Sequence, residues 1–218
     1  MVERLDFIND LIKDGQKVSF DFDGVLSDSR APVLDEFNKI VFEKTGIKNK
    51  YKYEDVTGWD SLYELSLKLG YKEKEAREFN FNIWTDPFIL RKAKPLEDGL
   101  EVYRSFMKKD CVPPIITVRN KGLRDVTFEW FKEYLPEVPK NKINIRDNEP
   151  IDGNDFKIGK ILENNVNWHF DDSEEITKLI LRKLNKAKVV HIAPVPNLEI
   201  ARNKRVVVIP YWEWSPRT

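Results

Sequence analysis

The stretch FDFDGVLSDS, residues 20–29, decides how this chain is interpreted. Apolar and polar side chains alternate from Lys17 to Asp23, as expected of a β-strand, and two acids, Asp21 and Asp23, lie at its end. Gly24 follows directly and permits a sharp turn. In an open parallel sheet, ligands bind beyond the carboxyl ends of the strands. The two acids therefore indicate a binding or catalytic site.

The second half of the chain indicates a parallel sheet. From residue 96 onward, helical patterns alternate with short, β-branched and almost continuously apolar strands. Such strands are typical of a sheet that helices cover on both faces. We therefore expect an α/β fold with a Rossmann-like parallel sheet. Its later strands are expected in the segments 112–118, 142–145, 166–172, 188–192 and 205–210.

Residues 29–95 interrupt this alternation, because they have helical patterns and no convincing strand. Helices are expected at 31–46, 60–69 and 73–84. We predict that this segment is a small helical cap inserted after the first strand. The catalytic core would then comprise residues 1–28 and 96–218.

Composition limits the classes of function. Hydrophobic residues make up 41% of the 218 residues, enough for a sizeable core. Lys plus Arg and Asp plus Glu both number 37, and a net charge of zero argues against sequence-independent nucleic-acid binding. The single cysteine, Cys111, excludes an internal disulfide and is expected to be a buried thiol in a reducing compartment. No apolar run reaches the roughly 18 residues of a membrane span, and the N-terminus lacks a signal-peptide pattern, so a cytoplasmic protein is expected.

Polar residues also end the other predicted strands. Thr117 closes the segment 112–118, and Asp171 and Asp172 close the segment 166–172. If these strands are parallel neighbours, four carboxylates meet in one crevice and repel one another unless a cation is present. A hard divalent ion such as Mg²⁺, held by oxygen ligands, resolves this repulsion. The predicted metal ligands are Asp21, Asp23, Asp171 and Asp172.

Four motifs, in this order along nearly the whole chain, resemble those of the haloacid dehalogenase-like (HAD) phosphohydrolases. DFDGVLSD matches the first motif, and IIT, ending at Thr117, matches the second. Lys157 in DFKIGKIL matches the third, and HFDDS matches the fourth. The resemblance implies a HAD-like fold and phosphoryl transfer at the carboxyl edge of the sheet.

The resemblance also implies a role for each matched residue. Asp21 would be the nucleophile that forms an aspartyl-phosphate, and Asp23 would be the general acid and then the general base. Mg²⁺ and Lys157 would offset the negative charge that opposes attack on a phosphate ester. The predicted phosphate-binding residues are Gly24, Thr117, Val118, Arg119 and Lys157.

Two of these assignments have alternatives, and a nearby histidine is a further candidate ligand. Lys160 lies one helical turn beyond Lys157 and could take its place, although the spacing from Lys157 to Asp171 suits the family better. Arg119 fits either a phosphate-facing basic rim or ordinary surface charge. His169 is expected to be a hydrogen-bonded core histidine rather than a metal ligand.

Within the family, the chain is most similar to the 5'(3')-deoxyribonucleotidase-like group. The first motif, the helical cap after it, the segment PFILRKAKPLEDGLEVYRSF and the tail RVVVIPYWEW carry this similarity. The chain departs from that group at Ser29 and Arg30, where an aromatic residue that stacks on a base is common, and at Val118. The predicted substrate-pocket residues are Arg30, Trp59, Trp84 and Phe88.

The sequence thus predicts a Mg²⁺-dependent phosphomonoesterase that acts on a small phosphorylated substrate, a nucleoside monophosphate. Alternatives are a phosphatase of another small metabolite, a nucleic-acid end phosphatase and a phosphotransferase. A non-enzymatic alternative is an idle HAD-like binding module, which would predict the loss of motif residues that are all present. No membrane partner is expected, nucleic acid is disfavoured, and a homodimer is among the expected assemblies.

Overall fold

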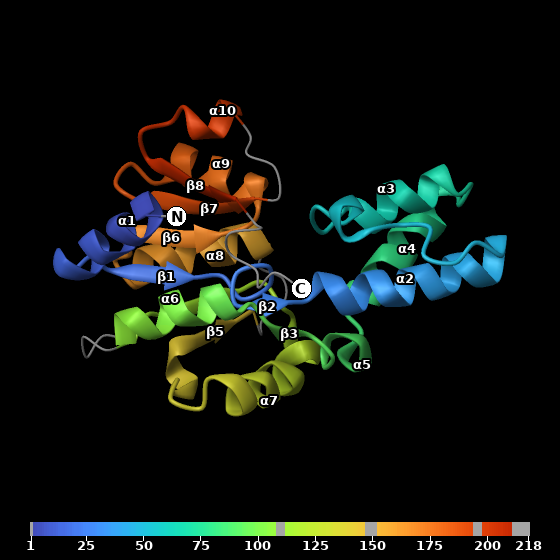
Figure 1. The fold of residues 1–218 in the computed structure, drawn as a ribbon, viewed down its shortest axis with the longest axis horizontal. Coiled ribbons are helices and arrows are strands. Elements are labelled where there is room, and N and C mark those ends of the chain that lie inside the picture. Colours follow the sequence, from blue (N-terminus) through green and yellow to red (C-terminus); the bar gives the residue numbers. More distant parts are fainter. Residues whose placement is uncertain (1, 108–111, 147–151, 194–197, 211–218) are drawn as a thin grey trace.

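A computed structural model describes residues 2–107, 112–146, 152–193 and 198–210; the predicted burial of Cys111 lies outside them. The main element is a six-stranded sheet with the order β5-β4-β1-β6-β7-β8, in which all pairings are parallel (Figure 1). This confirms the predicted α/β fold. The strands are β1 (Val18–Phe20), β4 (Ile115–Thr117), β5 (Ile143–Ile145), β6 (Trp168–Asp171), β7 (Lys188–Ala193) and β8 (Val206–Pro210).

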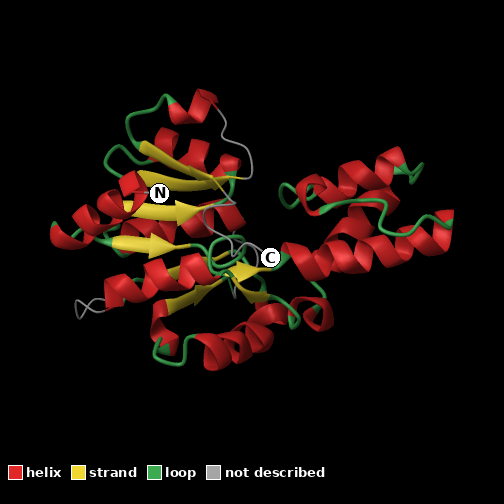
Figure 2. Ribbon diagram, viewed as in Figure 1, coloured by secondary structure: helices red, strands yellow, loops and turns green. Residues whose placement is uncertain are grey.

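Helices cover both faces of this sheet (Figure 2). Side chains that alternate along each strand point to opposite faces, so Ile115 packs with one buried cluster and its neighbour Ile116 with another. The helices that pack with Ile115 are α1 (Val2–Lys13), α6 (Glu97–Met107) and α7 (Arg124–Tyr134). Those that pack with Ile116 are α8 (Gly153–Glu163) and α9 (Glu174–Lys183).

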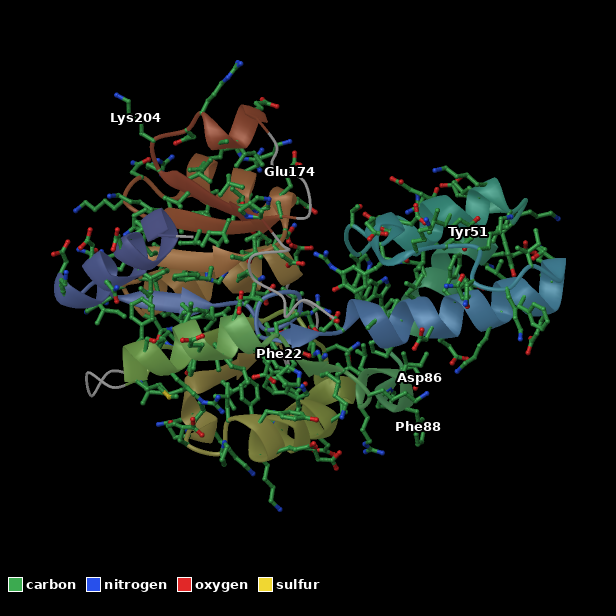
Figure 3. All side chains as sticks on the ribbon, in the orientation of Figure 1. Phe22, Tyr51, Asp86, Phe88, Glu174 and Lys204 are labelled. Carbon is green, nitrogen blue, oxygen red and sulfur yellow. The ribbon has the colours of Figure 1, made fainter. Side chains whose placement is uncertain are left out.

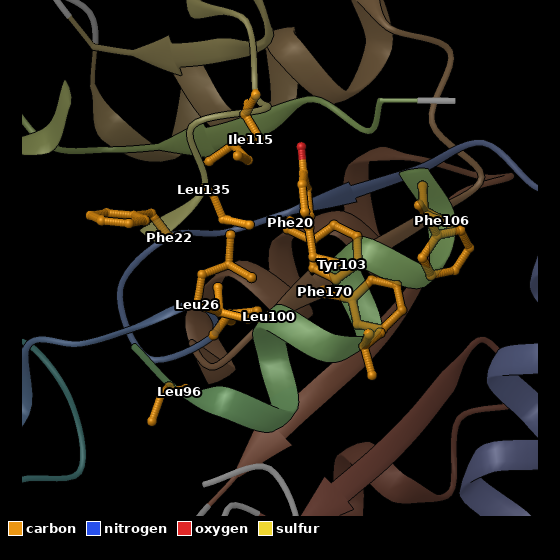
Figure 4. Packing of buried hydrophobic residues seen from close by; sticks show 14 of the residues in the cluster. Phe20, Phe22, Leu26, Leu96, Leu100, Tyr103, Phe106, Ile115, Leu135 and Phe170 are labelled. Carbon is orange, nitrogen blue, oxygen red and sulfur yellow. The ribbon is translucent and has the colours of Figure 1, made fainter. Parts of the chain in front are cut away.

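Aromatic side chains fill the centre of the first cluster (Figure 4). Phe20 of β1 and Phe170 of β6 are register partners, and their rings stack with centroids 4.3 Å apart. Tyr103 of α6 meets Phe20 edge-on and donates its hydroxyl hydrogen bond to the carbonyl of Pro113. This packing fixes β1 between β4 and β6, and hence fixes the ends of the three strands that carry the motif residues.

Residues 29–93 lie beyond the carboxyl ends of the strands (Figure 1). They have a buried cluster that includes Phe37, Leu62 and Ile83. The sequence did not predict the two-residue strands that join this segment to the rest, β2 (Ser27–Asp28) and β3 (Lys94–Pro95), which pair antiparallel. The helices are α2 (Arg30–Thr45), α3 (Ser61–Lys68), α4 (Glu73–Trp84) and α5 (Pro87–Leu90).

Helix α8 begins at Gly153, because Asp152 accepts hydrogen bonds from the backbone N–H groups of Asn154 and Asp155. Lys157 is therefore in the second turn of the helix. None of the helices in the described ranges is long and apolar enough to cross a membrane. The remaining short helices are η1 (Tyr53–Asp55), η2 (Lys121–Leu123), η3 (Lys140–Lys142) and α10 (Leu198–Ala201).

Candidate active site

The parallel order β4-β1-β6 brings the predicted site residues to one edge of the sheet. Asp21 follows β1 directly, Thr117 ends β4, and Asp171 ends β6. The backbone N–H of Asp21 still donates to the carbonyl of Phe170 at 2.8 Å, so the ladder between β1 and β6 positions this acid. The chain then turns away at Gly24.

Three of the four predicted metal ligands form one cluster. Oxygen atoms of Asp21, Asp171 and Asp172 all lie within 4.8 Å of one another. Burial raises the pKa of Asp21 well above its usual range, and Asp171 and Asp172 raise it further, although Lys157 acts in the opposite direction. Burial also raises the pKa of Asp172, against the effect of Arg30.

Lys157 is the buried cation of this cluster. Its Nζ lies 2.7 Å from Oδ2 of Asp171 and 2.9 Å from Oδ2 of Asp21. Burial alone would lower the pKa of Lys157, but the two carboxylates outweigh this effect and raise it. The alternative residue, Lys160, instead pairs with Glu163 at 2.6 Å, so the structure brings Lys157 and not Lys160 to the acids.

Asp171 lies behind the other two acids and is fully buried. Its Oδ2 contacts Lys157 and also Nε2 of His169 at 2.8 Å, and its Oδ1 accepts from the N–H of Ser173. Burial alone would raise the pKa of Asp171, but Lys157 and His169 reverse this effect and lower it. Nδ1 of His169 lies 2.8 Å from the hydroxyl of Ser19. His169 is therefore a buried histidine whose two ring nitrogens both have partners, as expected.

Asp23 is not in the acid cluster. Its two carboxylate oxygens accept from Nε and Nη2 of Arg119 at 2.9 and 2.7 Å. Arg119 is itself buried, donates to the hydroxyl of Thr127 and lies over the ring of Phe22. Arg119 is thus a fixed partner of Asp23, which neither sequence interpretation of this arginine anticipated. The metal-ligand role of Asp23 stays a prediction.

Gly24 makes room for Asp172. It has φ +73°, and an added Cβ would lie 2.0 Å from Oδ2 of Asp172. The same oxygen accepts from Nη2 of Arg30, the first residue of α2, at 2.5 Å. Arg30 is buried and lines the cavity described below, so this predicted pocket residue also contacts a predicted metal ligand.

The two remaining phosphate-binding candidates differ in exposure. Thr117 is 1% exposed, and its hydroxyl accepts from the N–H of Arg119 at 3.3 Å. Thr117 is not among the residues that line the cavity described below, whereas Val118 lines it. Access of a phosphate to the Thr117 hydroxyl stays a prediction.

A cavity of about 850 Å³ extends from the acids to helices α3 and α4. Asp21, Asp23, Asp172 and Lys157 line one part of it. Trp59 and Trp84 line the part formed by residues 29–93, and their rings stack with centroids 5.7 Å apart. The structure does not place Phe88 in this lining; its side chain is on the outer side of α5 and the residue is 73% exposed (Figure 3).

Sequence reasoning missed several residues that line this cavity. Asp60 and Glu64 are on the α3 side, and Glu174, labelled in Figure 3, begins α9 on the opposite side. Their sequence contexts are those of ordinary acids in a first helical turn, which is a favourable position for any acid because of the helix dipole. The sequence carried no other signal for them.

The donor set of the acid cluster fits a hard divalent cation. Oxygen atoms of three carboxylates lie within 4.8 Å of one another, close enough to ligate one ion, and burial raises the pKa values of Asp21 and Asp172. Asp21 and Asp172 line the cavity and would hold the ion on that side, whereas Asp171 does not line it. A bound cation would supply charge neutralisation for an anionic ligand in the cavity.

Comparisons with known proteins identify the fold. No family model matches the chain, and no curated protein matches its sequence. A HAD hydrolase of family IA, variant 3, from Entamoeba histolytica is 17% identical, with a TM-score of 0.60 over 89% of this chain and 92% of that chain. A HAD family hydrolase from Deinococcus radiodurans, solved with bound phosphate and sodium, is 14% identical, with a TM-score of 0.62 over 91% and 92%. A haloacid dehalogenase-like hydrolase from Streptococcus pneumoniae is 13% identical, with a TM-score of 0.60 over 91% and 95%. The chain therefore has the fold of the HAD hydrolases.

Proposed function

We propose that this chain is a Mg²⁺-dependent phosphomonoesterase that acts through an aspartyl-phosphate, with nucleoside monophosphates as substrates. The observation that carries the proposal is the cluster of Asp21, Asp171 and Asp172 around buried Lys157 at one part of a cavity. The hydrolases with the same fold support phosphatase chemistry. Three of the four motifs that resemble those of the HAD family lie at the ends of β1, β4 and β6, and Lys157 of the third motif contacts Asp21 from α8.

In the proposed mechanism, a carboxylate oxygen of Asp21 attacks phosphorus, and the bond from phosphorus to the ester oxygen breaks. Asp23 donates a proton to the departing oxygen. Asp23 then accepts a proton from the water that attacks the aspartyl-phosphate, which releases phosphate and restores Asp21. Lys157, 2.9 Å from Oδ2 of Asp21, holds the nucleophile in place and offsets its charge. Mg²⁺, when bound, supplies further stabilisation of the transferring phosphoryl group.

The division into a core, residues 1–28 and 96–218, and a cap, residues 29–95, is part of this proposal. The cap would cover the substrate and exclude water from the aspartyl-phosphate. Trp59 and Trp84 in the cavity wall support a substrate with a flat, apolar part such as a nucleobase. A wall of helices over the acids is less suited to the end of a nucleic-acid duplex.

The test is Mg²⁺-dependent phosphate release from nucleoside 5'- and 3'-monophosphates, sugar phosphates and end-phosphorylated oligonucleotides. Asp21→Asn should abolish release, and Asp35→Asn, an exposed acid of α2, should leave it unchanged. Release only from oligonucleotides would assign the chain to nucleic-acid end repair. No release from any substrate by a chain that binds Mg²⁺ would contradict the proposed activity.

A further inference from the structure

The cavity wall opposite the catalytic acids has an unusual combination of side chains. On the cap side it carries three aromatic rings, Trp59, Phe81 and Trp84, and two carboxylates, Asp60 and Glu64. Trp59 is 47% exposed and Phe81 is 53% exposed, although large aromatic side chains are normally covered. This part of the cavity is where the leaving group of a phosphate ester held at Asp21 would lie.

The cations of the cavity lining are not evenly distributed, whereas carboxylates line both sides. Three cations line it near the catalytic acids, and each is paired: Arg30 with Asp172, Arg119 with Asp23, and Lys157 with Asp21. The fourth, Arg146, is on the core side, after β5. The wall formed by α3 and α4 has carboxylates but no cation among the described lining residues.

Asp60 does not have the usual role of an acid at its position. It is the N-cap residue of α3, yet its side chain accepts no capping hydrogen bond. The neighbouring Ser61 instead holds the loop before the helix, because its hydroxyl accepts from the N–H groups of Thr57 and Gly58. Glu64 follows four residues later, on the same face of the helix. Neither acid lies within ion-pair distance of a cation in the described part of the chain, although the pKa of the Arg77 guanidinium of α4, raised mainly by a hydrogen bond to Glu73, is also raised by Asp60.

A second, independent feature of this wall is Trp84. Its indole Nε1 is buried and has no acceptor among the described residues, although the residue lines the cavity. A buried donor without an acceptor is unfavourable. Trp84 therefore has an unmet donor in this wall, and Asp60 and Glu64 would accept from N–H groups of a ligand in the cavity.

We infer that the leaving group carries N–H donors, an amino or ammonium group, and no second anionic group. This inference rests on the proposed phosphatase function and specifies its substrate class. Carboxylates accept hydrogen bonds from amino groups, aromatic faces attract cations and stack on bases, and both features are unfavourable to a second carboxylate or phosphate. Two sources share this chemistry: a nucleobase with an exocyclic amino group, and an alkylammonium alcohol.

Matched substrate pairs test the inference. CMP and UMP differ at C4, which carries an amino group in CMP and an oxo group in UMP, and at N3, which carries a hydrogen only in UMP; GMP and IMP differ by the 2-amino group alone. Phosphoethanolamine and phosphoglycolate have similar size and opposite charge at the far end. We expect the kcat/KM of the amino member to exceed that of its partner by about 10-fold or more, as a charge-assisted hydrogen bond allows. The double variant Asp60→Asn, Glu64→Gln should bring the ratio close to one.

Controls separate this effect from helix stability. Glu97→Gln removes an exposed acid from the first turn of α6, outside the cavity, and should leave each ratio unchanged. Trp59→Leu should raise KM for the amino substrate, whereas Phe88→Leu, outside the cavity, should not. Equal use of both members of every pair, or preference for phosphoglycolate, would overturn the inference.

The substrate pairs distinguish failure of this inference from failure of the proposed phosphatase function. Hydrolysis of the amino and oxo members of both nucleotide pairs at equal rates leaves a nucleotidase and overturns the requirement for an amino group. Hydrolysis of phosphoethanolamine but of no nucleotide confirms the requirement for an amino or ammonium group and overturns the nucleotide assignment. If no substrate is hydrolysed, calorimetric titration of CMP and UMP into the Mg²⁺-loaded chain tests the inference by binding alone. Tighter binding of CMP than of UMP, lost in the double variant, supports it. Equal binding of the two nucleotides, or no binding, overturns it.

Discussion

Arg119 holds both carboxylate oxygens of Asp23, with donor–acceptor distances of 2.9 and 2.7 Å. The two residues are 96 positions apart, and the arginine is fixed in turn by Thr127 and by the ring of Phe22. A bidentate pair between a guanidinium and a carboxylate restricts both position and orientation. The proposed general acid and base therefore has its side chain held in place before substrate binds.

Arg119→Met should lower kcat by about 10- to 100-fold, because general acid–base catalysis contributes roughly 10²- to 10⁴-fold and depends on orientation. Arg119→Lys should recover only part of this loss, since lysine cannot form the bidentate pair. Steady-state kinetics on an alkyl phosphate and on an aryl phosphate with a better leaving group provide the measurement. The loss should be smaller for the aryl phosphate, which needs less protonation. Lys121→Met is the control and should leave kcat unchanged. An unchanged kcat in Arg119→Met as well would show that Arg119 does not position Asp23 for catalysis.

Lys157→Met should destabilise the fold as well as abolish activity. The change leaves Asp21 and Asp171 buried without their cation, and breaking a buried pair in this way costs about 3–5 kcal/mol. Lys160→Met, one turn further along α8, breaks only a partly exposed pair with Glu163 and should cost at most about 1 kcal/mol. Urea unfolding of the two variants measures the difference. Similar midpoints for both variants would contradict the central role of Lys157.

Gly24→Ala should weaken Mg²⁺ binding by about 10-fold or more, as expected for a change that displaces a ligand. The added Cβ would lie 2.0 Å from Oδ2 of Asp172, so the carboxylate must move. Gly15→Ala is the matched control, because Gly15 also has positive φ, +63°, but no atom lies within 4 Å of an added Cβ. Both variants have backbone strain of about 1–2 kcal/mol, and only Gly24→Ala should change Mg²⁺ affinity in calorimetric titration. Equal Mg²⁺ affinity in the two variants would refute this account.

The stabilisation that Mg²⁺ provides should increase with pH. Asp21 and Asp172 have pKa values raised by burial, so between the ordinary aspartate value and the raised values the folded chain binds more protons than the unfolded chain. Stability without metal therefore falls as pH rises through that interval. The lowered pKa of Asp171 acts in the opposite sense, with stability lost as pH falls, but only below the ordinary aspartate value. Melting temperatures in EDTA and in Mg²⁺ across this range measure the effect, which Asp21→Asn should reduce. A pH-independent effect of Mg²⁺ would contradict the prediction.

The sequence by itself determined the architecture of the core. Short apolar strands that alternate with helices require a parallel sheet covered on both faces, and this sheet was found. It also predicted that Asp21 and Asp171 would meet, because the carboxyl ends of neighbouring parallel strands lie at one edge. Lys157, on a helix, was expected there only through the resemblance to the HAD phosphohydrolases, and the structure places it against both acids. Local periodicity and strand direction suffice for such predictions, since each depends on residues close together in the chain.

Only the tertiary structure decided which side chains pair. Arg30 and Asp172 are 142 positions apart, and Arg119 and Asp23 are 96 apart; neither pair leaves a local pattern in the sequence. The structure likewise placed Asp60 and Glu64 in the cavity wall and Phe88 outside it, although all three are in helical segments of similar appearance. Such pairings depend on how whole elements pack and on which rotamers that packing leaves open, so the sequence specifies them only through the completed fold.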